Sequence, residues 1–156
     1  RCFTYDQTRM GKNCDSFQAI KFRSMIVANM IDRGANDPLE THRITRLCNF
    51  LRRSRLDEVP QIINVFKGEM SLIGPSPDYI EHAKVYVDTI PGYIERHAVR
   101  PGISGFAQTE VGYGEGIEAT RTKVKADLQY IKNRTLTFEA WIVWCTLQTV
   151  IKRGGA

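Results

Sequence analysis

Two short segments near the start of the chain favour β-strands, and hydrophobic and polar positions partly alternate in the second of them, residues 17–22. Residues 2–5 and 17–22 are rich in aromatic and β-branched side chains, and residues 11–13 (Gly-Lys-Asn) between them are typical of a turn. This pattern predicts a β-hairpin over the first 25 residues. Residues 32–38 combine glycine, asparagine, aspartate and proline, which favours a loop.

Apolar residues recur at helical spacing over residues 43–55. Four of them follow the positions i, i+3, i+4 and i+7 and share one face of a predicted helix: Ile44, Leu47, Cys48 and Leu51. The same segment carries five arginines: Arg43, Arg46, Arg52, Arg53 and Arg55. A short basic amphipathic helix of this kind can lie on an anionic membrane surface. It can equally pack on the core with a solvated basic face, and the pattern leaves both interpretations open.

A second helix is predicted from Asp57 to Lys67. Asp57 is a favourable N-cap residue, and Glu58 complements the helix dipole in the first turn. Pro60 is tolerated this early in a helix, and Lys67 followed by Gly68 is a stop signal. Backbone N–H groups are free at a helix N-terminus, so this location favours anions such as phosphate.

Two rigid turns divide the rest of the chain, at residues 74–77 (Gly-Pro-Ser-Pro) and 100–105 (Arg-Pro-Gly-Ile-Ser-Gly). Helices are predicted over residues 78–90 and 119–133. Residues 112–116 form a glycine-rich loop, but their spacing matches neither a dinucleotide-binding nor a phosphate-binding fingerprint.

The last predicted helix, residues 138–152, is unusually apolar and contains Trp141 and Trp144. It is too short to span a bilayer. Two tryptophans followed by Lys152 and Arg153 suit a helix at a membrane interface, and a buried core helix fits the same pattern.

These elements predict an α+β fold for residues 1–156: one mostly helical domain with a small N-terminal β-hairpin and interfacial amphipathic helices. A length of 156 residues, 42% of them hydrophobic and 25% charged, is ordinary for a single soluble globular domain. Strands and helices do not alternate in a way that suggests a parallel sheet. The chain starts without a methionine, and we expect it to be a fragment or a processed chain.

Charge and cysteine usage narrow the function classes. The formal net charge of +5 favours anionic partners, among them nucleic acid, anionic lipid and phosphorylated small molecules. No helix-turn-helix, RRM or KH signature is present, so we expect no nucleic-acid partner. The four cysteines form no C-x-x-C pair, which argues against a structural zinc site and fits free thiols in a reducing compartment.

The adjacent carboxylates Asp57 and Glu58 have two interpretations. Both can stabilise a helix start, each by about 1 kcal/mol. Alternatively, one carboxylate attacks a phosphorus centre while its neighbour holds a metal ion. The second interpretation needs cations that neutralise phosphate oxygens, and the candidates are Lys21, Arg23 and Arg100.

Several segments together resemble the bacterial sugar transferases, also called monotopic phosphoglycosyl transferases. The segments occur in the family's order and cover essentially the whole chain: residues 21–25, 43–46, 50–53, 56–61, 64–75, 99–108 and 127–131. Residues 90–108 resemble most the exopolysaccharide branch, whose members often use galactose or glucose.

The resemblance implies an enzyme at the cytoplasmic face of the bacterial inner membrane. It would transfer a sugar-1-phosphate from a UDP-sugar to a polyprenyl (undecaprenyl) phosphate, initiate a surface glycan and release UMP. Asp57 would form a covalent phosphosugar intermediate, and Asp57 and Glu58 would bind Mg²⁺. The implied substrate-binding residues are the following: Lys21, Arg23, Ser76, Arg100 and Gln108.

The chain departs from the family pattern in three places. Ser76 stands where the family usually has arginine in Gly-Pro-Arg-Pro, and Glu139 stands where aspartate is common. Serine cannot make the bidentate phosphate contact of arginine, so a non-catalytic member that binds UDP-sugar or regulates a partner is the alternative function. The hydrophobic segment that precedes the matched region in the family is absent, so we expect a catalytic portion without its main membrane anchor, with a homodimer possible.

Overall fold

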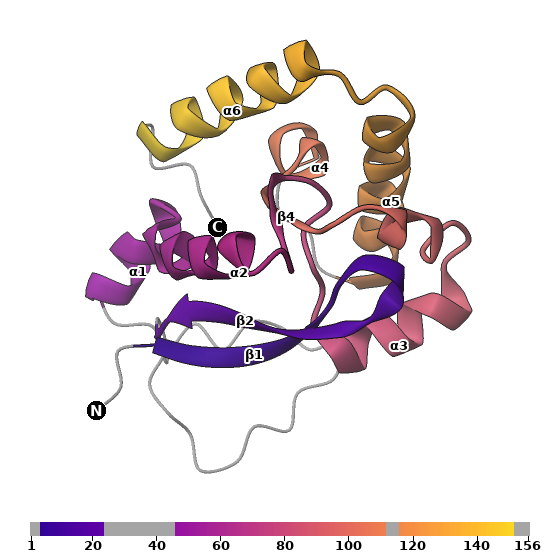
Figure 1. The fold of residues 1–156 in the computed structure, drawn as a ribbon, viewed down its shortest axis with the longest axis horizontal. Coiled ribbons are helices and arrows are strands. Elements are labelled where there is room, and N and C mark those ends of the chain that lie inside the picture. Colours follow the sequence, from indigo (N-terminus) through magenta and orange to yellow (C-terminus); the bar gives the residue numbers. More distant parts are fainter. Residues whose placement is uncertain (1–3, 24–45, 112–115, 152–156) are drawn as a thin grey trace.

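The computed structural model describes residues 4–23, 46–111 and 116–151, and it has the predicted α+β architecture. An N-terminal hairpin packs beside helices that make up most of the fold (Figure 1). Helix α6 (Leu136–Ile151) runs along one edge of the molecule, and the hairpin lies toward the opposite side. Among the described residues, no helix is both long enough and apolar enough to cross a membrane.

The predicted hairpin is confirmed. Strand β1 (Thr4–Met10) pairs antiparallel with β2 (Ser16–Phe22), with Thr4 opposite Phe22 and Met10 opposite Ser16. The turn contains a short 3₁₀ helix, η1 (Lys12–Cys14). The first strand continues well beyond the predicted residues 2–5, because cross-strand pairing outweighs the weak strand preference of its polar residues.

The described helices follow one another in this order: α1 (Arg46–Arg53), η3 (Leu56–Gln61), α2 (Ile62–Phe66), α3 (Ile80–Thr89), η4 (Glu95–Ala98), α4 (Phe106–Glu110), α5 (Gly116–Lys132) and α6. Helices α3, α5 and α6 confirm the three predicted helices to within a few residues at each end. Helix α1 confirms the central part of the predicted basic helix. Residues 43–45, the predicted loop at 32–38 and the first four residues of the predicted loop at 112–116 lie outside the described residues, whereas Gly116 begins α5.

The segment around Asp57 differs from the prediction. It is not one α-helix capped by Asp57 but a 3₁₀ helix, η3, followed by the short α2. Asp57 lies inside the first turn, and the residue before η3 is Arg55, whose φ of 54° is left-handed and which makes no side-chain cap. The ring of Pro60 would collide with the carbonyl four residues earlier in an α-helix, which disfavours regular α-helical geometry over this stretch.

A parallel strand pair was not predicted. Strand β3 (Ser71–Ile73) pairs in parallel with β4 (Gly102–Ser104), so the two rigid turns of the sequence lie side by side. A Cβ atom on Gly102 would collide with the backbone of Gly74. Glycine is therefore required for this contact. Each strand has only three residues, and so short a segment carries no period-2 pattern that a sequence reading could detect.

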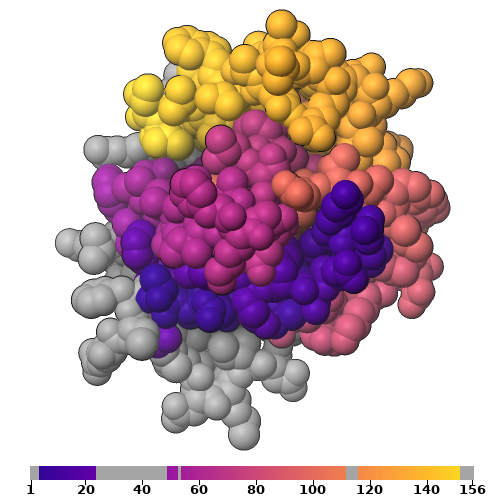
Figure 2. Space-filling view, viewed as in Figure 1, coloured from indigo at the N-terminus to yellow at the C-terminus, as the bar shows by residue number. Residues whose placement is uncertain are grey.

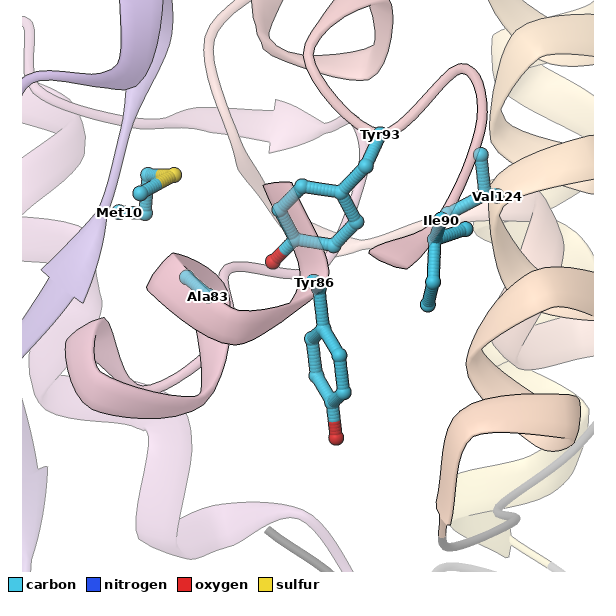
Figure 3. Close-up of a cluster of buried hydrophobic side chains, with 6 residues drawn as sticks. All are labelled: Met10, Ala83, Tyr86, Ile90, Tyr93 and Val124. Carbon is cyan, nitrogen blue, oxygen red and sulfur yellow. The ribbon is translucent and has the colours of Figure 1, made fainter. Parts of the chain in front are cut away.

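Two clusters form the buried core. The first joins the hairpin to α3, α5 and the turn after α3, and consists of Met10, Ala83, Tyr86, Ile90, Tyr93 and Val124 (Figure 3). The second consists of Ile73, Tyr130 and Ile142 and holds α5 and α6 against β3. These clusters fix the hairpin and the strand pair relative to the helices.

Helix α6 is buried on one face only. Ile142 is fully buried in the second cluster, whereas Trp144 and Leu147 are 60% and 50% exposed. Figure 2 shows α6 along one border of the visible face. One face of this helix therefore packs on the core, and another presents large apolar side chains to the surface.

Candidate active site

Lys21 and Glu58 form an ion pair between the hairpin and η3. The Lys21 Nζ atom lies 2.6 Å from Glu58 Oε1, and the two side chains are only 14% and 17% exposed. Lys21 is on β2, which packs against η3, so the tertiary structure joins residues that are 37 positions apart. The pair fixes one carboxylate of the acidic dyad beside a cation.

Asn64 sets the position of β2 against the helical segment. Its side chain is fully buried and accepts a hydrogen bond from the Ile20 N–H at 3.1 Å. It also donates to the Gln18 carbonyl at 2.7 Å and to Glu69 Oε2 at 2.7 Å. These bonds tie α2 to the strand residues next to Lys21. Asn64 therefore positions Lys21 against η3.

Asp57 lies in a partly buried, charged environment. Burial raises the pKa of its carboxyl group, and Glu58 raises it further, whereas Lys21 and Arg52 lower it. The local electrostatics thus balance desolvation against two nearby cations. A carboxylate in such surroundings is less hydrated than one in water, while the cations keep favouring its charged form.

Arg52 and Tyr5 complete this neighbourhood, and the sequence analysis assigned no site role to either. Arg52 Nη1 is buried and has no hydrogen-bond partner in the described part of the chain. Tyr5 is opposite Lys21 in the hairpin register. Burial raises the pKa of the Tyr5 hydroxyl, and the charges of Asp57 and Glu58 contribute to the same shift. Arg52 lies five residues before Asp57, in a segment that resembles the family. This position was the sequence signal that could have identified it.

The dyad supplies the ligand type that Mg²⁺ prefers. Glu58 and Asp57 present hard carboxylate oxygens, and the ion pair with Lys21 uses one oxygen of Glu58. The described residues contain no group of three or more His, Cys, Asp or Glu side chains arranged to hold a metal. One or two carboxylates suffice for Mg²⁺ when water and substrate phosphates provide the other ligands, so the dyad fits such an ion.

The other predicted site residues lie elsewhere. Arg23 directly follows β2 and is exposed. Gln108, on α4, accepts a hydrogen bond from Arg55 at 3.4 Å, which links α4 to the residue that precedes η3. Arg100 lines a separate cavity, and the ion pair of Glu58 in the described structure is with Lys21 rather than with Arg100. The structure thus brings Lys21 to the dyad and leaves Arg100 apart from it.

Ser76 contributes its backbone to a buried ion network. The Ser76 carbonyl accepts a hydrogen bond from Arg96 Nη2 at 2.8 Å. Arg96 is 1% exposed and also pairs with Asp78 and Asp127, at 2.5 and 2.7 Å. Burial opposes ionisation of Asp78, but Lys123 and Arg96 outweigh it and hold the pKa of Asp78 well below its usual range. Arg96 therefore anchors the turn at 74–77 and cannot itself replace a substrate-binding arginine at position 76.

Comparisons with known proteins agree with the resemblance found in the sequence. A family model described as bacterial sugar transferase matches residues 2–153. The UDP-N-acetylgalactosamine-undecaprenyl-phosphate N-acetylgalactosaminephosphotransferase of Aeromonas hydrophila is 42% identical over 96% of this chain and 36% of its own length. The UDP-glucose:undecaprenyl-phosphate glucose-1-phosphate transferase of Escherichia coli K12 is 40% identical over 92% of this chain and 31% of its own length.

A third relative is shorter. The exopolysaccharide production protein PSS of Rhizobium leguminosarum bv. phaseoli is 36% identical over 96% of this chain and 78% of its own length. The chain therefore spans about a third of the first two relatives, at 36% and 31%, and most of the third.

Proposed function

Because this chain belongs to the bacterial sugar transferase family, we propose that its protein transfers a sugar-1-phosphate from a UDP-sugar to undecaprenyl phosphate and releases UMP. The names of the first two relatives describe reactions of this class. The observation that carries the proposal is the Asp57-Glu58 dyad, which is partly buried and ion-paired to Lys21 at 2.6 Å.

In the first step, a carboxylate oxygen of Asp57 attacks the β-phosphorus of the UDP-sugar. A new P–O bond forms to Asp57, and the bond from the β-phosphorus to the bridging oxygen breaks. UMP leaves with that bonding electron pair. A covalent intermediate of this kind divides one difficult displacement between two anions into two steps.

In the second step, a phosphate oxygen of the polyprenyl phosphate attacks the same phosphorus. The bond to Asp57 breaks, the carboxylate is regenerated, and the sugar is left on the lipid through a diphosphate. No proton needs to be gained or lost by Asp57 over the cycle.

Two cations next to the dyad serve the same step. Burial and Glu58 raise the pKa of Asp57, and Lys21, which is ion-paired to Glu58, opposes this rise and so favours the ionised nucleophile. The buried Nη1 of Arg52 is available to a phosphate oxygen, since it has no partner among the described residues. Mg²⁺ held by Asp57 and Glu58 would supply further neutralisation of diphosphate charge.

We also propose that the protein acts at the cytoplasmic face of the inner membrane in exopolysaccharide synthesis. The name of the third relative supports the exopolysaccharide role. The exposed side chains of Trp144 and Leu147 on α6 support contact with a membrane surface, because tryptophan and leucine suit the headgroup region.

The test uses full-length protein, a radiolabelled UDP-sugar, undecaprenyl phosphate and Mg²⁺. Asp57→Asn should lower formation of lipid-linked sugar by at least ~10³-fold, because an amide cannot act as this nucleophile. Asp88→Asn, on an exposed residue of α3, is the matched control and should retain normal activity. Intact-mass measurement after rapid quenching should find the phosphosugar adduct on the peptide 56–67. Normal product formation by Asp57→Asn would contradict this mechanism.

The same assay decides the alternative of a non-catalytic, UDP-sugar-binding or regulatory member, which Ser76 in place of arginine favours. UMP release by the wild-type protein excludes that alternative. Tight binding of UDP-sugar without any turnover would support it.

A further inference from the structure

A basic cavity lies away from the Asp57-Glu58 dyad. Its volume is about 310 Å³, and it is lined by the hairpin turn, the residues that begin the parallel strand pair and the end of α5. The polar lining consists of Lys12, Ser71, Arg100, Tyr130 and Arg134. The remaining lining is apolar and includes Val99.

The charges of this cavity are only partly balanced. Arg134 Nε is 2.7 Å from Glu139 Oε1, and the Tyr130 hydroxyl donates to the same oxygen at 2.8 Å. Lys12 and Arg100 have no carboxylate partner in the part of the chain that the structure describes. Three cations thus line one cavity, and among the described residues only Glu139 forms an ion pair with one of them, Arg134. An anion in the cavity would relieve their mutual repulsion.

The cavity is distinct from the Asp57-Glu58 dyad. Lys12 is in the closed end of the hairpin, whereas Lys21 is near its open end, opposite Tyr5. From Ser16 to Lys21, β2 advances about 17 Å at roughly 3.3 Å per residue. The basic cavity and the dyad are therefore at opposite ends of the hairpin.

The chemistry of the lining selects the ligand. Arginine and lysine together favour a phosphate group, since guanidinium offers paired donors and ammonium a compact charge. A volume of about 310 Å³ is at the small end of ligand cavities, which suits a mononucleotide better than an intact sugar nucleotide. The apolar wall at Val99 leaves room for a nonpolar part of the ligand.

We propose that this cavity is a second anion site, in which Lys12, Arg100 and Arg134 bind a phosphorylated ligand of mononucleotide size through its phosphate. The site is independent of the chemistry at Asp57. Arg100, which the family resemblance places with the substrate-binding residues, acts here.

The first experiment needs no variant. Full-length wild-type protein is treated with an acetylating reagent at several concentrations of UMP, and the modification rate of each lysine is measured by mass spectrometry. UMP at about ten times its Kd should slow acetylation of Lys12 by about tenfold. Lys125, an exposed residue of α5, is the internal control and should react at an unchanged rate. Lys21 reports separately on the dyad.

Three probes distinguish the sources of the phosphate. UMP represents a nucleotide, inorganic phosphate represents a free anion, and uridine has the nucleoside without the phosphate. Protection of Lys12 by UMP alone identifies a nucleotide site, and protection by UMP and inorganic phosphate identifies a general phosphate site; both support the proposal. Equal protection of Lys12 by uridine would overturn it, because the phosphate would then contribute nothing.

The second experiment compares charge-removing variants. Lys12→Gln with Arg100→Gln should weaken the calorimetric Kd of the pocket for UMP by about tenfold or more, the loss expected for two charged phosphate contacts. The matched control, Lys125→Gln with Arg121→Gln, removes the same charges from exposed positions of α5 and should leave the Kd unchanged.

A UMP-saturated wild-type protein in which Lys12 reacts at its free rate would overturn the proposal, whatever the behaviour of Lys21. Failure of the proposed transferase reaction would leave the protection of Lys12 unaffected. The two proposals therefore fail by different measurements.

Discussion

Lys21 Nζ and Glu58 Oε1 are 2.6 Å apart, and this contact joins the second strand of the hairpin to the 3₁₀ helix that carries Asp57. The pair is largely buried, so solvent screens it less than a surface ion pair. It places a cation beside the acidic dyad, where, in the proposed reaction, it would reduce the repulsion between the Asp57 carboxylate and a diphosphate.

Replacing Lys21 by methionine should lower activity and change its pH dependence. Since Lys21 lowers the pKa of Asp57, its removal raises that pKa, and the acidic limb of the rate profile moves to higher pH. The rate at pH 7 should fall by about 10²-fold, as for loss of other preorganised charge contacts. The control Lys84→Met removes an exposed ion pair with Glu81 and should alter neither quantity. An unmoved acidic limb would show that Lys21 does not act on Asp57.

Asn64→Ala should destabilise the protein strongly. The substitution removes the fully buried amide of Asn64 and leaves the part-buried Ile20 N–H and Gln18 carbonyl without their partners, at about 1–3 kcal/mol each. We expect the free energy of unfolding in urea to fall by about 2–5 kcal/mol. Asn133→Ala removes an exposed hydrogen bond to Gln129 and should change stability by less than about 0.5 kcal/mol. Equal stability of the two variants would contradict the positioning role of Asn64.

Arg96→Met should break the buried network beneath the turn at 74–77. It leaves the buried carboxylate of Asp127 and the largely buried one of Asp78 with less compensation, and loss of one partner from such a network costs about 3–5 kcal/mol. Chemical denaturation measures the loss. Arg121→Met, which removes an exposed pair with Glu118, is the comparison and should cost less than about 1 kcal/mol. A small effect at Arg96 would contradict its role as the anchor of this turn.

His97 should make the protein less stable in mild acid. Burial, aided by Arg96, lowers the pKa of His97 to about 4. Between pH 6.5 and 4, His97 is protonated in the unfolded chain but neutral in the folded protein. The free energy of unfolding therefore keeps its full value above pH 6.5 and falls as the pH decreases toward 4. At pH 4 the free energy of unfolding is lower by about 3 kcal/mol because of His97.

Urea unfolding at pH 7.5, 6 and 4.5 checks this prediction. His97→Asn should show a weaker pH dependence over that range, because asparagine does not titrate and can still donate to the Gly11 carbonyl that His97 contacts at 2.9 Å. Identical slopes for wild type and variant would rule out His97 as the source. His82→Asn, at a half-buried position of α3, is the matched histidine control.

The exposed face of α6 should contribute to membrane binding. Trp144→Ser with Leu147→Ser removes two large apolar side chains from this face. Flotation of the full-length protein with anionic liposomes should fall by about tenfold or more, since each side chain contributes on the order of 1–3 kcal/mol when transferred from water. Val85→Ser, an exposed position of α3, is the control. Unchanged flotation of the double variant would show that the exposed face of α6 does not contribute to membrane binding.

The local elements of this fold follow from short-range signals. The apolar spacing of residues 43–55 predicts α1, and the turn residues 11–13 predict the hairpin, because interactions within one short segment decide these structures. The Asp57-Glu58 dyad was likewise recognisable, since two adjacent acidic residues beside a family-like motif form a local pattern. The helix boundary at Asp57 was not, because the left-handed backbone of Arg55 leaves no residue-type signal.

The sequence by itself determined the hairpin, the helices α3, α5 and α6, the acidic dyad and the family. Only the tertiary structure decided that Lys21 meets Glu58, that Asn64 holds the strand beside them, and that Arg96 is buried beneath Ser76. It also placed Arg100 in a separate cavity with Lys12. These contacts join residues separated by at least 20 positions, and long-range pairing depends on the packing of whole elements, which no local pattern of residue types encodes.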